Sequence, residues 1–566
     1  MREKQQRIGF VQTAVISGVA AHPVTVEVNV AQGLPGISIV GMPDTAVSES
    51  KLRVRQALRS CDFEIPNMHI IVNLAPSSMP KSGSGFDLPI AAGILTATGQ
   101  IPTELLDGRL CVGELSLDGS VRPIKGMLAY ERLAAEMRIG LLSAVVGRGA
   151  QYEQAGSHLC IDSLQDLRQA SFCDPIATES DFCEHTIDYC DIADNDLAKR
   201  ALQIAAAGEH CLLMVGPPGS GKSMLAARLP TILAPLDINQ RRESAMIHSV
   251  AGLPYDSILQ GHRPFRAPHH SATRAGLLGG GSPPAPGEVS LAHNGVLFLD
   301  EMPEFGSAVL QMLRQPIENG TVSLARARGT TVFPAAFLLI AAANPCPCGY
   351  FGDPERHCRC SPAEIARYQG RIGGPLIDRF DMVIDVWRSQ PGDVLATGTG
   401  LSSAKMLATV MQAQEFRQKR EQNAPVTGSI SGIDRFSTEL LNGIHHADSG
   451  PAKRDSFLST SSSGTCASTS DSSDAASPSG VGHGASIAFK GEGYRLLETC
   501  RLSARERDCL KEAARHFELS GRGIMKALAV ARTIADLEQS EAVCCEHLLE
   551  AVTFRAESRA RNDIHR

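Results

Sequence analysis

The sequence contains the stretch Gly216-Pro217-Pro218-Gly219-Ser220-Gly221-Lys222-Ser223, which follows the apolar run Cys211–Val215 and precedes the helical pattern Met224–Leu229. A strand, a glycine-rich loop and a helix in this order are typical of a phosphate-binding P-loop. Successive backbone N–H groups and the helix N-terminus would face the phosphate oxygens. Lys222 adds a positive charge, and the Ser223 hydroxyl can reach Mg²⁺. We therefore expect residues 216–223 to bind ATP with Mg²⁺.

Two further apolar runs end in polar residues. The run Gly295–Leu299 reads as a buried strand that ends in Asp300 and Glu301, which suit a carboxylate for Mg²⁺ and a second one to orient the attacking water. The run Ala336–Ala343 ends in Asn344, whose amide could hold that water against the γ-phosphate. An asparagine after a strand is often only a turn former. Beside the other two elements, we favour the catalytic interpretation.

The composition sets limits on the class of protein. A chain of 566 residues is too long for one core and predicts about three or four domains. Because the net charge is −7, any contact with DNA must come from local basic loops. The longest apolar stretches fall short of the roughly 18 residues that a membrane span needs. We expect a cytoplasmic protein with no membrane contact, in which the 16 cysteines are thiols or metal ligands.

The pattern along the chain divides it into segments. Residues 1–170 read as a mixed α/β domain, 171–195 as an acidic linker, 196–390 as the P-loop domain, and 391–566 as a helical domain. An insert at 449–487 is rich in Ser, Gly and Asp and nearly free of large apolar side chains. Such a segment cannot offset its ordering entropy, so we expect it to be disordered.

A helix is expected over Ala308–Glu318, followed by a β-hairpin with a basic tip that carries Arg326 and Arg328. If such hairpins surrounded a channel, their positive field could follow a DNA backbone without reading its sequence. The alternative is that these arginines form surface ion pairs near Glu318.

Four cysteines lie within a short Gly/Pro-rich loop directly after Asn344. They are Cys346, Cys348, Cys358 and Cys360, with His357 beside them. Paired C-x-C sequences can close a tetrahedral Zn²⁺ site, which here would be structural. Buried free thiols and a redox pair are the alternatives.

Taken in the order in which they occur along the chain, the motifs resemble those of the YifB/ComM family of Mg-chelatase-like AAA+ ATPases. The most specific stretches are Val72–Pro76, Phe86–Ala91, Arg263–His270, Pro286–Glu301, Asn344–Gly349, Gly374–Asp381 and Val530–Leu537. The resemblance implies an α/β fold class with a Lon-protease-like (ribosomal S5 domain 2-like) N-terminal domain, an AAA+ P-loop core and a C-terminal helical lid. It also implies a homo-hexameric ring. ComM-type members are helicases that promote branch migration of transforming DNA.

The resemblance also assigns roles to single residues. Arg379 is similar to the arginine finger that reaches the neighbouring subunit's ATP, with Arg371 as its rival, and Arg522 is similar to the lid arginine that senses the γ-phosphate. The alternative for Arg379 is simple pairing with Asp378 or Asp381.

The N-terminal domain departs from the Lon pattern at the catalytic positions. Gly85 stands where that fold has its nucleophilic serine, and Leu128 stands near the place of its lysine. Ser84 and Lys125 are neighbours in sequence, but nucleophilic catalysis needs the pair within hydrogen-bond reach. We therefore expect a non-proteolytic binding domain.

Two functions from different classes remain at this stage. The first is an ATP-driven hexameric motor that acts on single-stranded or branched DNA. The second is a chelatase-type subunit that drives a partner protein to insert Mg²⁺ into a porphyrin. The Lon-like domain, the cysteine cluster and the absence of a D-x-S-x-S motif favour DNA.

Overall fold

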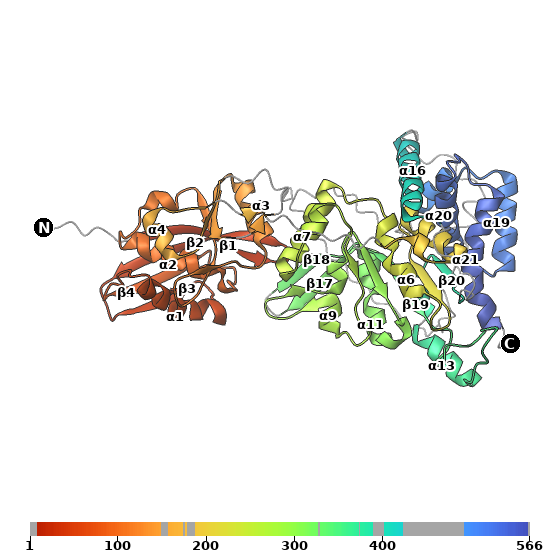
Figure 1. Cartoon of the computed structure of the whole chain (residues 1–566), viewed down its shortest axis with the longest axis horizontal. Helices are drawn as coiled ribbons and strands as arrows, with labels where there is room; N and C mark the ends of the chain where they lie inside the picture. The colour runs from red at the N-terminus through yellow and green to blue at the C-terminus, as the bar shows by residue number, and fades with distance from the viewer. Residues whose placement is uncertain are drawn as a thin grey trace, which may run out of the picture. The chain divides into compact units, whose positions relative to one another are not determined.

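The computed structural model describes residues 8–145, 147–148, 157–173, 176–177, 187–326, 329–372, 374–388, 401–422 and 492–563 (Figure 1). The chain divides into two compact units. The first comprises Met1–Thr186, Pro235–Leu297 and Thr321–Phe337, and the second comprises Ile187–Ala234, Phe298–Gly320 and Leu338–Arg566. The expected insert at 449–487 lies outside the described residues.

Among the described residues of the first unit, seven strands form one mixed sheet in the order β10-β8-β5-β1-β2-β4-β3. Their bounds are β1 Ile8–Ser17, β2 Ala20–Ala31, β3 Gly36–Val40, β4 His69–Ala75, β5 Arg109–Cys111, β8 Gly140–Ala144 and β10 His158–Ile161. Alternate residues of β2, from Val24 to Val30, are buried, as the period of two predicts. β2 pairs antiparallel with both β1 and β4, whereas β3 runs parallel to β4.

Helices cover this sheet. α2 (Asp87–Ala97) packs on β1 and β2 and contacts α1 (Thr45–Ser60), whose first turn is capped by the Asp44 side chain. α3 (Met127–Met137) contacts β2 and β8. The small elements here are β6 Glu114–Leu115, β7 Val121–Arg122, β9 Gly147–Arg148, β11 Ile176–Ala177 and α4 Leu164–Gln169. The sequence pattern predicts strands over Val24–Val30, Ile37–Val40 and His69–Leu74 and a helix over about Ser48–Ser60, and the structure confirms them as β2, β3, β4 and α1.

A second sheet has the strand order β13-β16-β19-β12-β20 within the described part of the chain. The strands are β12 Leu212–Val215, β13 Phe265–Arg266, β16 Val296–Leu299, β19 Leu338–Ala343 and β20 Met382–Asp385. β12 lies between β19 and β20 and runs parallel to both, with Val215 opposite Ala343 and Asp385. β12, β16 and β19 are buried along their whole length, as strands of a parallel sheet covered on both faces are.

Helices of the second unit pack on this sheet and on one another. α5 (Asp196–Gly208) contacts β12, β20 and the helix α20, and α21 contacts β20. The others are α6 Lys222–Ala227, α11 Ser307–Met312, α12 Arg314–Asn319, α13 Pro362–Ile372, α14 Gly374–Ile377, α16 Ser403–Gln422, α18 Glu492–Cys500, α19 Ala504–His516, α20 Gly521–Leu537 and α21 Cys545–Asp563. α19 begins with the expected Ser503/Glu506 capping box.

The remaining elements belong to the first unit. They are α7 Ile238–Ala251, α8 Asp256–Leu259, α9 Arg274–Leu278, α10 Glu288–Leu291, β14 Gly279–Gly280, β15 Ala285–Pro286 and the hairpin β17 Thr321–Arg326 with β18 Gly329–Pro334. No described helix is long and apolar enough to cross a membrane.

The single helix expected over Ala308–Glu318 is wrong. The structure has two short helices, α11 and α12, which break at Leu313. Pro316 has no N–H to donate to the carbonyl of Met312, so the helix cannot continue through this point.

The predicted linker also differs at its end. Residues 187–195 pack into the second unit, where the Tyr189 ring is fully buried and its hydroxyl donates to the Leu225 carbonyl at 2.8 Å. A large aromatic with a hydrogen-bonded hydroxyl is a packing residue. The acidic composition of residues 187–195 led to the prediction of a linker, although Tyr189 makes this segment part of the core.

Candidate active site

The three predicted catalytic segments all follow strands of the second sheet. The P-loop follows β12, Asp300 follows β16, and Asn344 follows β19. In an open parallel sheet the carboxyl ends of the strands form the ligand-binding edge. The topology therefore brings these segments together although they are far apart in sequence.

The P-loop has the backbone that its glycines predict. Gly219 and Gly221 have φ angles of 79° and 85°, in the region that side chains disfavour. Lys222 is only 8% exposed and donates to the carbonyl oxygens of Gly216 and Pro217 at 2.8 and 2.9 Å. The ammonium group thus lies inside the loop, where phosphate oxygens can replace the carbonyls as its partners.

Burial changes the acidity of this lysine. Desolvation lowers the pKa of Lys222 to about 8, and the nearby charges of Asp300 and Glu301 only partly oppose this effect. The two carboxylates and the lysine are therefore electrostatic neighbours.

The magnesium ligands that we predicted are in contact. The Ser223 hydroxyl donates to Asp300 Oδ2 at 2.6 Å, and the other Asp300 oxygen accepts the backbone N–H of Glu301 at 2.9 Å. A hydroxyl beside a carboxylate at a P-loop is the oxygen pair that holds Mg²⁺ in this class of site.

Glu301 and Asn344 lie at the same edge of the sheet. Glu301 is exposed and has a φ of 48°, a left-handed conformation that is uncommon for a residue with a side chain and is often found at functional sites. Asn344 is half-buried at the end of β19. Their roles toward the attacking water stay predictions.

The three arginines that the resemblance singled out have different surroundings. The Arg379 side chain is 17% exposed and forms an ion pair with Glu318 of α12, a partner that neither interpretation of this arginine named. The rival Arg371 pairs with Glu304 at 3.3 Å. Arg522 is exposed in the first turn of α20. The roles of finger and sensor stay predictions.

One neighbour of the P-loop was missed from the sequence. The Arg388 side chain donates to the Pro218 carbonyl at 3.1 Å, and its positive charge helps to lower the pKa of Lys222. Its place shortly after β20, at the ligand-binding edge, is the signal that could have found it. Asp381, just before β20, pairs with Lys526 of α20 at 2.9 Å.

The four predicted cysteines form one cluster. Cys346 Sγ lies 3.4 Å from Cys348 Sγ, and Cys358 Sγ lies 3.6 Å from each of these. The four sulfur atoms, including that of Cys360, lie within 4.8 Å of one another and could hold a metal ion. His357 is exposed and does not belong to the cluster. All four cysteines are free, without disulfides.

The predicted hairpin is confirmed as β17 and β18, which pair from Thr321–Pro334 to Arg326–Gly329. Arg326 is exposed at its end, and Arg328 lies outside the described residues. No ion pair engages Arg326 within the part of the chain that the structure describes. Glu318, the partner suggested by the alternative, is paired with Arg379.

The N-terminal domain shows no paired serine and lysine among its described contacts. The Ser84 hydroxyl donates to Glu114, and the Lys125 stem lies against Gly252. The absence of proteolytic activity stays a prediction.

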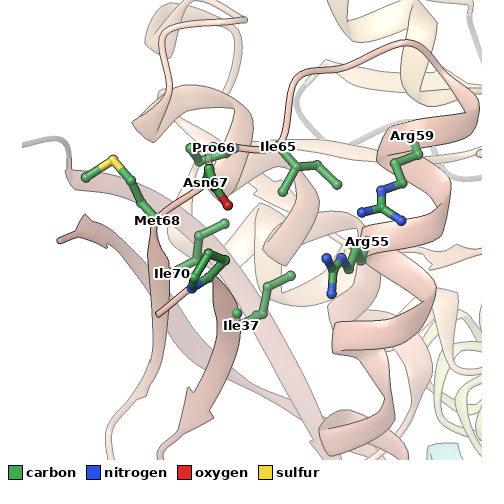
Figure 2. Close-up of a pocket in the computed structure, with 10 residues that line it drawn as sticks. Ile37, Arg55, Arg59, Ile65, Pro66, Asn67, Met68 and Ile70 are labelled. Atoms are coloured by element: carbon green, nitrogen blue, oxygen red, sulfur yellow. The ribbon is translucent and has the colours of Figure 1, made fainter. Parts of the chain in front are cut away.

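Figure 2 shows a hollow of about 110 Å³ in the same domain, beside Arg55 and Arg59 of α1. It is far too small for a nucleotide, since ligand pockets measure about 300–1,000 Å³.

The sequence is similar to known proteins along most of its length. Residues 188–394 match the family described as magnesium chelatase, subunit ChlI, residues 26–145 match subunit ChlI of Mg-chelatase, and residues 489–555 match the ChlI C-terminal family. An uncharacterized protein YifB of Salmonella typhimurium is 36% identical over 97% of both chains. The competence protein ComM of Haemophilus influenzae is 35% identical, also over 97% of both chains. An uncharacterized protein of Mycobacterium tuberculosis is 39% identical over 75% of this chain and 86% of its own.

Proposed function

The chain belongs to the Mg-chelatase-like family that includes YifB and ComM, and from this premise we propose that it is an ATP-hydrolysing hexameric motor that acts on DNA, as a helicase for branch migration. The observation that carries the ATPase is the contact of Ser223 with Asp300, next to Glu301 and the buried Lys222. Similarity to a competence protein over nearly the whole chain supports DNA as the substrate.

Each residue has a stated part in hydrolysis. Lys222 and the P-loop N–H groups bind the β- and γ-phosphates, while Ser223 and Asp300 hold Mg²⁺. Glu301 polarises the attacking water and Asn344 orients it. Arg379 of a neighbouring subunit neutralises the charge that develops on the transferred phosphoryl group. In this proposal the Arg379–Glu318 pair opens or turns when two subunits meet.

The hairpin is the proposed contact with DNA. Arg326 is exposed and has no acidic partner among the described residues, so its charge is available to phosphate. In a ring, the hairpins of several subunits would surround a channel and follow the backbone of single-stranded or branched DNA.

The chelatase-type function is the second candidate, and the names of the matching families favour it. Because residues 26–145 match a family named for a chelatase subunit, the N-terminal domain does not separate the two candidates. The match to ComM over 97% of both chains keeps DNA as our first choice.

The test is the ATPase rate of the full chain with no DNA, with single-stranded DNA and with a branched junction. We expect stimulation by DNA and ATP-dependent unwinding of the junction, both lost in Glu301→Gln. An ATPase that is indifferent to DNA and unable to unwind it would overturn the proposal. Magnesium insertion into protoporphyrin upon addition of chelatase partner subunits would establish the second candidate instead.

A further inference from the structure

We infer that the four-cysteine cluster is a structural zinc site that holds the nucleotide site in its working geometry. The metal closes the cysteine loop, residues 345–360, which contacts the P-loop at Pro218 and continues from Asn344. The inference rests on the proposed nucleotide site and is independent of whether DNA is the substrate.

The sulfur positions suit a single tetrahedral ion. With Zn–S bonds of about 2.3 Å, neighbouring sulfurs of a tetrahedral site lie roughly 3.8 Å apart. The sulfurs of Cys346, Cys348 and Cys358 lie 3.4–3.6 Å apart, far from the roughly 2.05 Å of a disulfide, and that of Cys360 lies within 4.8 Å of them. The backbone N–H of Cys360 donates to Cys358 Sγ at 3.4 Å, as outer hydrogen bonds at metal thiolates do. Four sulfur ligands select zinc or another soft metal over Mg²⁺.

The cysteine loop is irregular. It contains no helix or strand, and among its cysteines only Cys346 is fully buried. Turns held by hydrogen bonds shape parts of it, such as Gly349 N–H to the Cys346 carbonyl and Asp353 N–H to the Tyr350 carbonyl. Closing an irregular loop of this length costs conformational entropy, which metal binding can offset. In this proposal the metal ion joins the two ends of the loop, which these turns do not connect.

The loop packs directly against the P-loop. Gly349, with a φ of 84°, lies so near Pro218 that a Cβ at this position would be 2.5 Å from the proline Cδ. Arg388 provides a second link, because it donates to the Pro218 carbonyl while its guanidinium lies 5.3 Å from the centre of the Tyr350 ring and 3.9 Å from Asp353. The cysteine loop thus contacts Pro218 in two ways. Gly349 lies against the proline ring, and Arg388 links the loop to the proline carbonyl.

The same loop positions Asn344. Cys346 follows two residues after it, and the intervening Pro345 carbonyl accepts a hydrogen bond from Gln369 at 3.1 Å. Asn344 therefore lies between β19 and the first metal ligand. Loss of the metal frees both Pro218 and Asn344, so nucleotide affinity and turnover should fall together.

The first experiment measures metal and nucleotide binding on the full chain, purified without chelator and without DNA. We expect about one zinc per chain by elemental analysis. Cys360→Ser, and the double variant Cys346→Ser/Cys348→Ser, should lose the zinc and raise the Kd for a fluorescent ATP analogue about tenfold or more. Cys173→Ser, an exposed cysteine outside the cluster, is the matched control and should leave both quantities unchanged.

The buried Cys346 could make the double variant misfold, so a second route avoids mutation. A thiol-reactive mercurial releases the zinc from the wild-type protein, and thiol with added Zn²⁺ should restore both zinc content and nucleotide affinity. Gly349→Ala keeps all four cysteines but pushes the loop away from Pro218. It should retain zinc and still weaken nucleotide binding, because the P-loop depends on the position of the cysteine loop at Pro218.

Two results would overturn the inference. One is protein that binds the ATP analogue normally yet contains no stoichiometric zinc or other thiophilic metal. The other is zinc loss, by mercurial or by Cys360→Ser, with unchanged nucleotide affinity. Neither depends on DNA, so failure here is distinguishable from failure of the proposed motor function.

Discussion

Lys222 and Glu301 occupy the same site but should fail in different ways. Lys222→Ala removes the charge that binds phosphate, so we expect it to abolish binding of the fluorescent ATP analogue. Glu301→Gln removes only the group that polarises water, so binding should persist while kcat falls at least a hundredfold, or about 3 kcal/mol of activation free energy. Wild-type turnover in Glu301→Gln would show that the water is activated elsewhere.

The burial of Lys222 also predicts a pH dependence. Its pKa of about 8 is well below the ordinary pKa of lysine. The protein without nucleotide therefore loses this positive charge as the pH rises past 8. Bound phosphate favours the protonated form, so ATP binding should take up a proton and weaken above pH 8. Titration calorimetry in two buffers of different ionisation enthalpy checks this. A nucleotide affinity that is constant from pH 7 to 9.5 would contradict it.

At the scale of elements, the hairpin β17–β18 is the predicted DNA contact. Replacing Arg326 and Arg328 with Ala should weaken DNA binding and reduce the slope of log K against log salt by about one per lost phosphate contact. Unwinding should fall, whereas the DNA-free ATPase should be nearly unchanged. Arg132→Ala is the matched control, because this exposed arginine already pairs with Glu136.

Normal unwinding by the double variant would show that Arg326 and Arg328 are not the DNA contact, and other basic residues would then have to be tested. Arg266 is paired with Glu288 at 2.6 Å, and Arg263 donates to the Asn294 carbonyl at 2.8 Å. Arg274, at the start of α9, would then be the next candidate.

An ion pair joins Lys526 of α20 to Asp381, the residue just before β20, and the two side chains are 15% and 19% exposed. Burial alone would raise the pKa of Asp381, but the charge of Lys526 and the contact with His210 outweigh it and hold this pKa well below the ordinary range. The pair therefore stabilises the fold at neutral pH, and this contribution is lost as the pH falls below about 4, the unfolded value.

Removing the lysine tests this pair. Lys526→Met should destabilise the helical domain by about 1–3 kcal/mol at neutral pH. It should also flatten the loss of stability in acid, as thermal unfolding at pH 7 and at about pH 2 would show. Lys526→Arg, which keeps the charge, should stay close to wild type. Equal melting temperatures for the Met and Arg variants would rule out a stabilising role for the pair.

At the scale of the whole molecule, the choice between Arg379 and Arg371 depends on assembly. If Arg379 acts on the ATP of a neighbouring subunit, Arg379→Ala and Lys222→Ala should each be inactive, yet their mixture should regain part of the ATPase. Mixed rings would then contain some sites with an intact P-loop facing an intact arginine. We expect Arg371→Ala to retain activity by itself, because its exposed pair with Glu304 is worth only about 0–1 kcal/mol.

The outcome of the mixing experiment also tests the ring. No recovery in the mixture, with each variant folded and assembled, would show that Arg379 acts within its own chain or does not act at all. Recovery with Arg371→Ala in place of Arg379→Ala would reverse the assignment.

Most of the nucleotide site could be predicted from short local patterns. The P-loop, the acids after β16 and the four cysteines each depend on a few consecutive residues, whose geometry is set by the strand before them or by ligand spacing. The pattern of apolar residues, the placement of glycines and the spacing of cysteines were enough to identify these segments. Local rules failed where a single residue interrupted a pattern, as Pro316 of α12 does in the helix expected over Ala308–Glu318.

What the sequence alone determined, therefore, is the family, the sheet edge that carries the nucleotide site and the set of candidate ligands. Only the tertiary structure decided the partners: Ser223 with Asp300, Arg379 with Glu318, Arg388 with Pro218 and Lys526 with Asp381. Each of these pairs joins residues that are far apart along the chain. Such contacts depend on how strands and helices pack, and packing is set by the whole core and not by neighbours in sequence.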